Sequence, residues 1–293
     1  MIAVGAPGSD ELQGMVYLFR PGDNGNGGTT WLSLDELKDN MAPAAQVGNF
    51  GWSVALHKTI LLVGAPFNED LGKGKLFIYK GETNVWGLYD TIAPGIDDSN
   101  DQFGFSVALD DSIAVVGARE ADNGVGAAYI YEIPEGDPPN PYTQDRVAPL
   151  NSSTDAIFGH SVALKNGIMV VGSPTRTESG SFYLYYLKEN EPFKWERSER
   201  VLDGSDNDNQ YAKSVAISEN NLVVGAPENE IRNAGPGSMF AFELVKEKDN
   251  EVTQVPVEIS PMEKPSSSSS IPGEIPLNLV SMSIPGKRYV SSL

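Results

Sequence analysis

A Val-Gly pair recurs along most of this 293-residue chain at intervals of 53 to 59 residues. A repeat of this length constrains the fold more than any local pattern, because each copy must form the same structural unit. The glycines of the five copies are Gly5, Gly64, Gly117, Gly172 and Gly225. We therefore expect one unit of about 55 residues to occur about five times.

Three further motifs recur in a fixed order around each Val-Gly pair. Phe-Gly-x-Ser-Val-Ala-Leu, or a degenerate version of it, precedes four copies and begins at Phe50, Phe103, Phe158 and Tyr211. A glycine followed by alternating aromatic residues comes after each pair, as in Gly126, Tyr129 and Tyr131. A fourth aromatic position precedes the next copy, at Trp31, Trp86, Tyr142 and Trp195. We interpret the recurring aromatic residues as packing between units.

These motifs predict four short strands per unit. The Ser-Val-Ala-Leu stretch and the aromatic stretch alternate with period two, and the run before Val-Gly is rich in β-branched residues. Four-stranded sheets at this spacing indicate an all-β fold, a β-propeller of four-stranded antiparallel blades. A β-sandwich is the alternative, but it does not explain four motifs in fixed order. Residues 34–41 are the only fair candidate for a helix.

The motif positions also predict the domain boundaries. We expect the propeller to occupy residues 1–245, with blades at about 2–47 (partial), 50–102, 103–157, 158–210 and 211–245 (partial). Residues 246–293 contain five consecutive serines and several prolines, which predict a largely disordered linker or tail. A closed ring of five blades would require the tail to supply strands, and residues 252–259 and 277–284 are the candidates.

Composition excludes several classes of function. With 40 acidic and 21 basic residues, the net charge of −19 argues against nucleic acid as a partner. The chain has no cysteine and only two histidines, which excludes disulfides and cysteine-ligated metals and disfavours a multi-histidine site. No stretch of about 18 apolar residues predicts a transmembrane segment, and the first residues do not resemble a signal peptide.

The acidic residues gather in two sets of connections, which follow the second and the fourth strand of each unit. In a propeller both sets emerge on one face, so we expect an acidic face that binds a ligand. The candidate residues are Asp70, Asp97, Asp98, Asp101, Asp122, Asp155, Asp203, Asp206 and Asp208. Four of them are also weak calcium candidates: Asp97, Asp101, Asp206 and Asp208. The alternative is that Asp, Asn, Ser and Gly form turns in these connections.

The combination of Phe-Gly-x-Ser-Val-Ala-Leu, Val-Gly-Ala-Pro and Gly-x-x-Tyr-x-Tyr resembles the FG-GAP repeat, the blade unit of integrin α-subunits. The resemblance covers residues 2 to about 245. It implies that the five blades are part of a seven-bladed ring at the cell surface or outside the cell. It also implies adhesion or binding of a protein or glycan ligand without catalysis.

The calcium loop of many FG-GAP blades has no counterpart here. The connections between the first two strands are only a few residues long, as in His57-Lys58-Thr59 and Asp110-Asp111-Ser112. Such turns are too short to supply the six to eight oxygen ligands that calcium takes. We therefore expect no cofactor at this position, and the resemblance is closest to the calcium-free branch of the family.

Two other functions remain open. Residues 24–31 loosely resemble a motif of sialidase propellers, and 40 acidic residues will include pairs at separations suited to glycoside cleavage. A carbohydrate-active hydrolase is therefore one alternative, although no nucleophile motif supports it. A purely structural spacer is the other.

Overall fold

The structure is a computed structural model. It describes residues 1–9, 13–23, 25–26, 28–39, 48–67, 72–82, 85–94, 100–136, 138, 142, 144–149, 156–175, 180–188, 193–202, 210–227, 238–246 and 252–257. These residues confirm the all-β prediction, because they form five antiparallel sheets and one very short helix.

The five sheets follow one another along the chain, and each consists of consecutive strands. Sheet 1 contains β1 (Ile2–Ala6), β2 (Met15–Asp23) and β3 (Thr29–Leu37). Sheet 2 contains β4 (Ser53–His57), β5 (Ile60–Ala65), β6 (Lys75–Glu82) and β7 (Val85–Ile92). Sheet 3 contains β8 (Phe103–Asp110), β9 (Ile113–Ala118), β10 (Ala127–Glu132) and β11 (Gln144–Val147). Sheet 4 contains β12 (Ser161–Lys165), β13 (Ile168–Ser173), β14 (Ser181–Leu187) and β15 (Trp195–Leu202). Sheet 5 contains β16 (Ser214–Ile217), β17 (Asn221–Ala226), β18 (Ser238–Lys246) and β19 (Val252–Val257).

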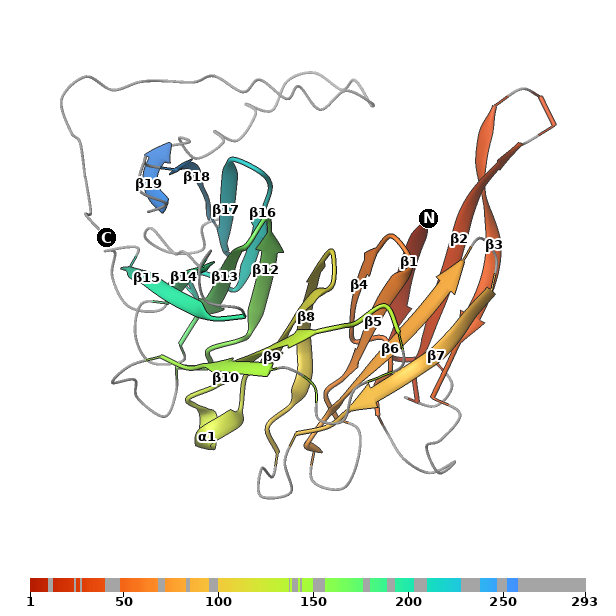
Figure 1. The fold of residues 1–293 in the computed structure, drawn as a ribbon, viewed down its shortest axis with the longest axis horizontal. Coiled ribbons are helices and arrows are strands. Elements are labelled where there is room, and N and C mark those ends of the chain that lie inside the picture. The colour runs from red at the N-terminus through yellow and green to blue at the C-terminus, as the bar shows by residue number, and fades with distance from the viewer. Residues whose placement is uncertain are drawn as a thin grey trace, which may run out of the picture.

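The sheets fan out side by side as the blades of a propeller (Figure 1). Their first strands lie innermost and contact one another in the order β1, β4, β8, β12 and β16. Each strand pairs with the next one along the chain, so every blade is a simple up-and-down sheet. The described residues thus provide five consecutive blades, as the sequence predicts.

Hydrophobic cores lie between successive sheets, with aromatic rings at equivalent places. The Phe of each Phe-Gly motif is fully buried, as predicted, and contacts the first aromatic residue of its own third strand edge-to-face. The ring centroids are 5.0 Å apart for Phe50 and Phe77, 5.4 Å for Phe103 and Tyr129, and 5.1 Å for Phe158 and Tyr183. This ring pair faces apolar side chains of the preceding sheet, for example Val16 and Leu18 of sheet 1. Sheets 2, 3 and 4 therefore each bury one face on the blade before them and the other on the blade after them.

The glycine of each Val-Gly pair allows neighbouring blades to approach at the backbone. A Cβ atom added to Gly5, Gly64 or Gly117 would lie 2.0 Å from the carbonyl oxygen of the next blade's Phe-Gly glycine, at Gly51, Gly104 and Gly159 respectively. Real Cβ atoms do not come this close to an oxygen, so any side chain would push the two sheets apart. The recurring glycine is thus a requirement of blade stacking.

A serine hydroxyl holds the same backbone contact together. Ser53 Oγ donates to the Gly104 carbonyl at 2.7 Å, and Ser106 Oγ donates to the Gly159 carbonyl at 2.8 Å. Ser161 Oγ donates to the Ala212 carbonyl at 2.9 Å. We call this hydrogen bond between an inner strand and the next blade the serine lock. It links three successive pairs of blades at the same place.

Two expectations differ from the structure. Residues 34–37 belong to β3 instead of a helix, because they pair with β2 through a register shift that follows Leu18. The helix found is α1 (Ala121–Gly124), which lies between β9 and β10. The last blade was expected to end at residue 245, but β19 pairs with β18 from Lys246 opposite Val252 to Ala241 opposite Val257. Sheet 5 therefore has four strands, and its last strand lies within residues 252–259, the candidate strand in the region otherwise expected to be tail.

Substituting Gly117 with Ala is expected to destabilise the protein by about 1–3 kcal/mol, because the new methyl group would overlap the Gly159 carbonyl and the Ser106 hydroxyl. Urea unfolding followed by far-UV circular dichroism measures the change. Gly87→Ala is the matched control, since a Cβ added at this exposed strand glycine meets nothing within 4 Å. Equal stability of the two variants would contradict the role we assign to the blade contact.

Candidate functional site

The blades present two different faces to the solvent at the ends of their strands. One end carries the two-residue turns between the first two strands of a blade, such as Lys58-Thr59 and Asp111-Ser112; we call it the hairpin face. The opposite end is where first strands begin and second strands end; we call it the loop face. Trp52, Asp101 and Asp122 lie at this end, because each is next to the start of a first strand or follows a second strand.

A row of rings crosses the loop face from blade to blade. Trp52, Phe105 and His160 occupy the position between Gly and Ser in three successive Phe-Gly-x-Ser motifs. The centroids are 5.4 Å apart for Trp52 and Phe105, and 5.0 Å apart for Phe105 and His160. Phe67, which follows β5, packs edge-to-face on Trp52 at 5.3 Å. We call Trp52, Phe67, Phe105 and His160 the aromatic row.

The stacking of blades explains why these four rings meet. The inner strands β4, β8 and β12 lie side by side, so the same motif position in successive copies falls at neighbouring places around the axis. Trp52 is 41% exposed, although most large aromatic side chains of the repeats are buried. The row is therefore an apolar and partly solvent-exposed surface at the inner edge of the loop face.

Arg119 fixes the middle of the row. Its guanidinium carbon lies 3.8 Å from the centroid of the Phe105 ring, which is a close cation–π contact. The guanidinium Nε donates to Gln102 Oε1 at 2.7 Å, and Glu120 Oε1 lies 3.7 Å from the same nitrogen. Because the arginine is held on several sides, the Phe105 ring has a defined orientation.

This row was not predicted from the sequence. The recurring aromatic residues were expected to pack between units, and Trp86 and Trp195 do so, at 7% and 6% exposure. Trp31 and Trp52, at 50% and 41% exposure, are not core residues. The signal that could have revealed the row is the one variable position inside an otherwise constant motif. In the fourth copy this position holds Lys213.

Of the nine aspartates predicted to bind a ligand, the structure describes two. Asp101 is only 4% exposed, so it does not present its carboxylate to solvent as expected, and its carbonyl accepts a hydrogen bond from the Glu120 amide at 3.2 Å. Asp122 is exposed, but its carboxylate is paired with Arg146 Nη2 at 2.5 Å. The other seven lie outside the described residues: Asp70, Asp97, Asp98, Asp155, Asp203, Asp206 and Asp208.

Within the described part of the chain, no group of three or more His, Asp or Glu side chains could hold a metal ion. Three of the four calcium candidates, Asp97, Asp206 and Asp208, are not among those residues. The fourth, Asp101, is buried. Calcium at the acidic connections thus stays a prediction.

On the hairpin face, ion pairs and hydrogen bonds connect neighbouring blades. Asp110 ends the first strand of sheet 3 and accepts hydrogen bonds from Lys165 Nζ at 2.9 Å and from the Asn166 amide at 2.7 Å, both in sheet 4. The hydrogen bond from Lys58 Nζ to Asp111 links sheets 2 and 3 and lowers the pKa of Asp111. These carboxylates are engaged with neighbouring blades. The polar groups of the hairpin face that we describe thus serve blade contacts.

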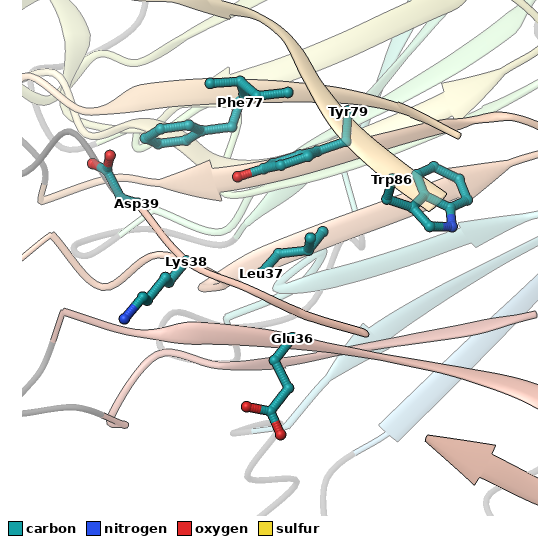
Figure 2. Close-up of a pocket in the computed structure, with 8 residues that line it drawn as sticks. Glu36, Leu37, Lys38, Asp39, Phe77, Tyr79 and Trp86 are labelled. Atoms are coloured by element: carbon teal, nitrogen blue, oxygen red, sulfur yellow. The ribbon is translucent and has the colours of Figure 1, made fainter. Parts of the chain in front are cut away.

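A hollow of about 210 Å³ lies between sheets 1 and 2 (Figure 2). Its lining residues are Glu36, Leu37, Lys38, Asp39, Phe77, Tyr79, Trp86 and Leu88. Burial and, to a smaller extent, the negative charge of Asp39 raise the pKa of Tyr79, whose hydroxyl is directed toward the side where Asp39 lies. The hollow is smaller than the roughly 300–1,000 Å³ of typical small-molecule sites. It gives no support to an enclosed active site.

The segment with a loose resemblance to sialidases gives no further support either. Residues 24 and 27 lie outside the described part of the chain, and Trp31 projects from β3 with half of its surface exposed. No helix among the described residues is long and apolar enough to cross a membrane.

Comparisons with known proteins agree with the architecture. Residues 44–79 and 86–131 match the FG-GAP repeat. Human integrin alpha-11 (Homo sapiens) is 38% identical over an 81-residue alignment, and the match covers 25% of this chain and 7% of that protein. The matched segment thus spans a small part of the relative's length.

The burial of the four tryptophans predicts how acrylamide quenches their fluorescence. Trp52→Phe and Trp31→Phe should each remove one quenchable component, and the double variant should retain only the protected emission of Trp86 and Trp195. Stern–Volmer titrations of the three variants check this. Strong quenching that persists in the double variant would contradict the assignment of Trp52 as the exposed ring of the loop face.

Proposed function

Since this chain carries FG-GAP repeats in integrin α-like blades, we propose that it is a non-catalytic binding module that takes a partner on its loop face. The proposed partner is a protein or glycan ligand, and the proposed role is adhesion. The same family resemblance leads us to place the protein outside the cell or at the cell surface.

The aromatic row is the observation that carries this proposal. Exposed tryptophan and phenylalanine side chains at fixed positions supply large apolar area with little loss of conformational freedom, and such residues dominate binding energy at interfaces. Arg119 and the adjoining blades hold Phe105 and His160 in place, so little ordering is needed on binding. A rigid apolar strip next to polar connections suits the centre of a partner interface.

Charge adds to the proposal. The acidic connections are predicted to lie on the same face, and the protein carries a net charge of −19. Complementary charge speeds association and selects partners more than it adds affinity. We therefore propose a partner surface with basic residues around an apolar centre, and we expect its association rate to fall as ionic strength rises.

The hydrolase and spacer alternatives have less support. A hydrolase needs a cleft that holds the substrate between two carboxyl groups, and the hollow between sheets 1 and 2 is too small for that role. A spacer has no need of an exposed tryptophan at a position where successive blades converge. A binding surface accounts for the aromatic row.

Replacing Trp52 with Ala should weaken partner binding by roughly fivefold or more, because truncating an aromatic residue at the centre of an interface removes about 1 kcal/mol or more of binding free energy. The measurement starts from an array of immobilised extracellular matrix proteins and glycans, which identifies a ligand. Surface plasmon resonance with that ligand then compares the variants. Trp31→Ala is the matched control, since Trp31 is at least as exposed as Trp52 but lies on β3, away from the row.

Two results would count against this function. Equal weakening by Trp31→Ala and Trp52→Ala would mean that the aromatic row is not the binding surface. Turnover of fluorogenic glycosides by the wild-type protein, abolished by replacing one loop-face carboxylate in a folded variant, would favour the hydrolase.

Calcium is the ion that we propose to test at the acidic connections. If residues 97–101 and 203–208 hold calcium as surface sites, isothermal titration at low salt should give a dissociation constant of about 10⁻⁴ to 10⁻³ M. The double variant Asp206→Asn, Asp208→Asn should lose one component of the heat. Asp145→Asn, outside both runs, should leave the titration unchanged. Absence of heat at millimolar calcium would remove calcium from the proposal.

A further inference from the structure

The hollow between sheets 1 and 2 lies apart from the aromatic row (Figure 2). Its walls come from the third and fourth strands of sheet 2 and from the end of β3, whereas the row lies on inner strands and on the connection after β5. Phe77, Tyr79 and Trp86 form one aromatic wall, and Leu37 of sheet 1 packs in the same core. All four side chains are buried, so the hollow has a fixed apolar lining.

The hollow is also bordered by a hydrogen-bond donor that the fold does not use. Trp86 is 7% exposed, and its Nε1 is buried with no hydrogen-bond partner among the described residues. An indole N–H can only donate, and a buried donor without an acceptor costs free energy. An atom that accepts from Trp86 is therefore favoured in this hollow.

The equivalent position of the next blade shows how the fold can use such a group. Tyr142 holds the place of Trp86 in sheet 3, since the strand residue two positions later lies opposite Tyr131 there and opposite Tyr79 in sheet 2. The Tyr142 hydroxyl donates to Asp90 Oδ2 of the preceding blade at 2.7 Å. In the described residues Trp86 makes no such bond to sheet 1, so its N–H stays available to a ligand.

Acceptors lie on the other side of the hollow. The carboxylate of Asp39 lines it, and a carboxylate can accept several hydrogen bonds. Burial and the negative charge of Asp39 raise the pKa of Tyr79, so the Tyr79 hydroxyl keeps its proton and can both donate and accept. A matching ligand must therefore offer an acceptor to Trp86 and a donor to Asp39 while covering apolar rings.

We propose that this hollow binds a single neutral sugar ring. Sugar hydroxyls both donate and accept, and they surround a ring whose C–H groups are apolar, which suits a few polar groups on an aromatic lining. One hydroxyl oxygen accepts from Trp86 Nε1, and another hydroxyl donates to Asp39. The hollow of about 210 Å³ corresponds to about seven water molecules at about 30 Å³ each, which is room for one ring but not for an oligosaccharide.

Charge selects among sugars. Glu36 and Asp39 line the hollow with one cation, Lys38, and the whole chain is strongly acidic. A like charge in such a place opposes binding, so the site favours a neutral sugar over one that carries a carboxylate. The site does not depend on the function proposed for the aromatic row, because the two surfaces share no residue.

Saturation-transfer NMR of the full-length protein tests the site with five neutral sugars: the methyl glycosides of glucose, galactose, mannose, fucose and N-acetylglucosamine. We expect at least one to bind with a dissociation constant of about 10⁻³ M, as suits a ligand of so few atoms. N-Acetylneuraminic acid, which carries a carboxylate, should bind at least about fivefold more weakly.

Variants locate the bound sugar. Trp86→Phe keeps an aromatic ring but removes the N–H, and it should weaken binding by about fivefold or more. Asp39→Asn, which leaves the buried core untouched, should weaken binding by about threefold or more. Trp195→Phe is the matched control, because Trp195 holds the equivalent place in sheet 4, with a buried Nε1 that also has no described partner, and does not line this hollow. Urea unfolding confirms that each variant is folded.

Three results would overturn the proposal. The first is the absence of saturation transfer from all five neutral sugars at about ten times the expected dissociation constant. The second is binding that Trp86→Phe and Asp39→Asn leave unchanged, or that Trp195→Phe weakens as much as Trp86→Phe does. The third is a dissociation constant that changes in Trp52→Ala but not in Trp86→Phe, which would place the sugar on the aromatic row.

Discussion

The close approach of two backbones is the contact on which the rest of this structure depends. In four successive interfaces the glycine of a Val-Gly strand lies against a carbonyl of the next blade, so close that a Cβ atom would come within 2.0 to 2.2 Å of the oxygen. This distance places the serine hydroxyl within reach of that carbonyl and lets the aromatic face of one sheet meet the aliphatic face of the sheet before it. The blade interface is therefore one unit of backbone contact, hydrogen bond and apolar core.

Because the blades repeat the same contact, equivalent residues of successive copies become neighbours in space. On the loop face this brings together Trp52, Phe105 and His160, which are 53 and 55 residues apart in the chain. On the hairpin face it aligns Asp110 with Lys165 and Lys58 with Asp111. The first set leaves an exposed apolar strip, whereas the second neutralises its charges within the fold. This difference makes the loop face the better candidate for binding.

Individual residues show which features of the fold could be predicted from the sequence and which could not. The motif order was sufficient for the all-β class, the number of blades and the burial of Phe50, Phe103 and Phe158, because a repeat specifies its own packing. The motif order did not predict that Asp101 is buried, because the exposure of a loop carboxylate depends on how the chain returns to the sheet. It placed the end of the last blade at residue 245 and offered residues 252–259 only as a candidate strand, because β19 carries none of the repeated motifs; the pairing with β18 establishes this strand.

The sequence by itself determined what every copy of the unit must do: form short antiparallel strands, bury an aromatic pair and keep a glycine where a side chain would separate the sheets. Those requirements are local or periodic, so they can be read from spacing and residue type. Only the tertiary structure decided which residues at the variable positions of the repeat come into contact. Trp52 and Phe105 come together because two blades stack at one angle around one axis, and that geometry is a property of the assembled sheets.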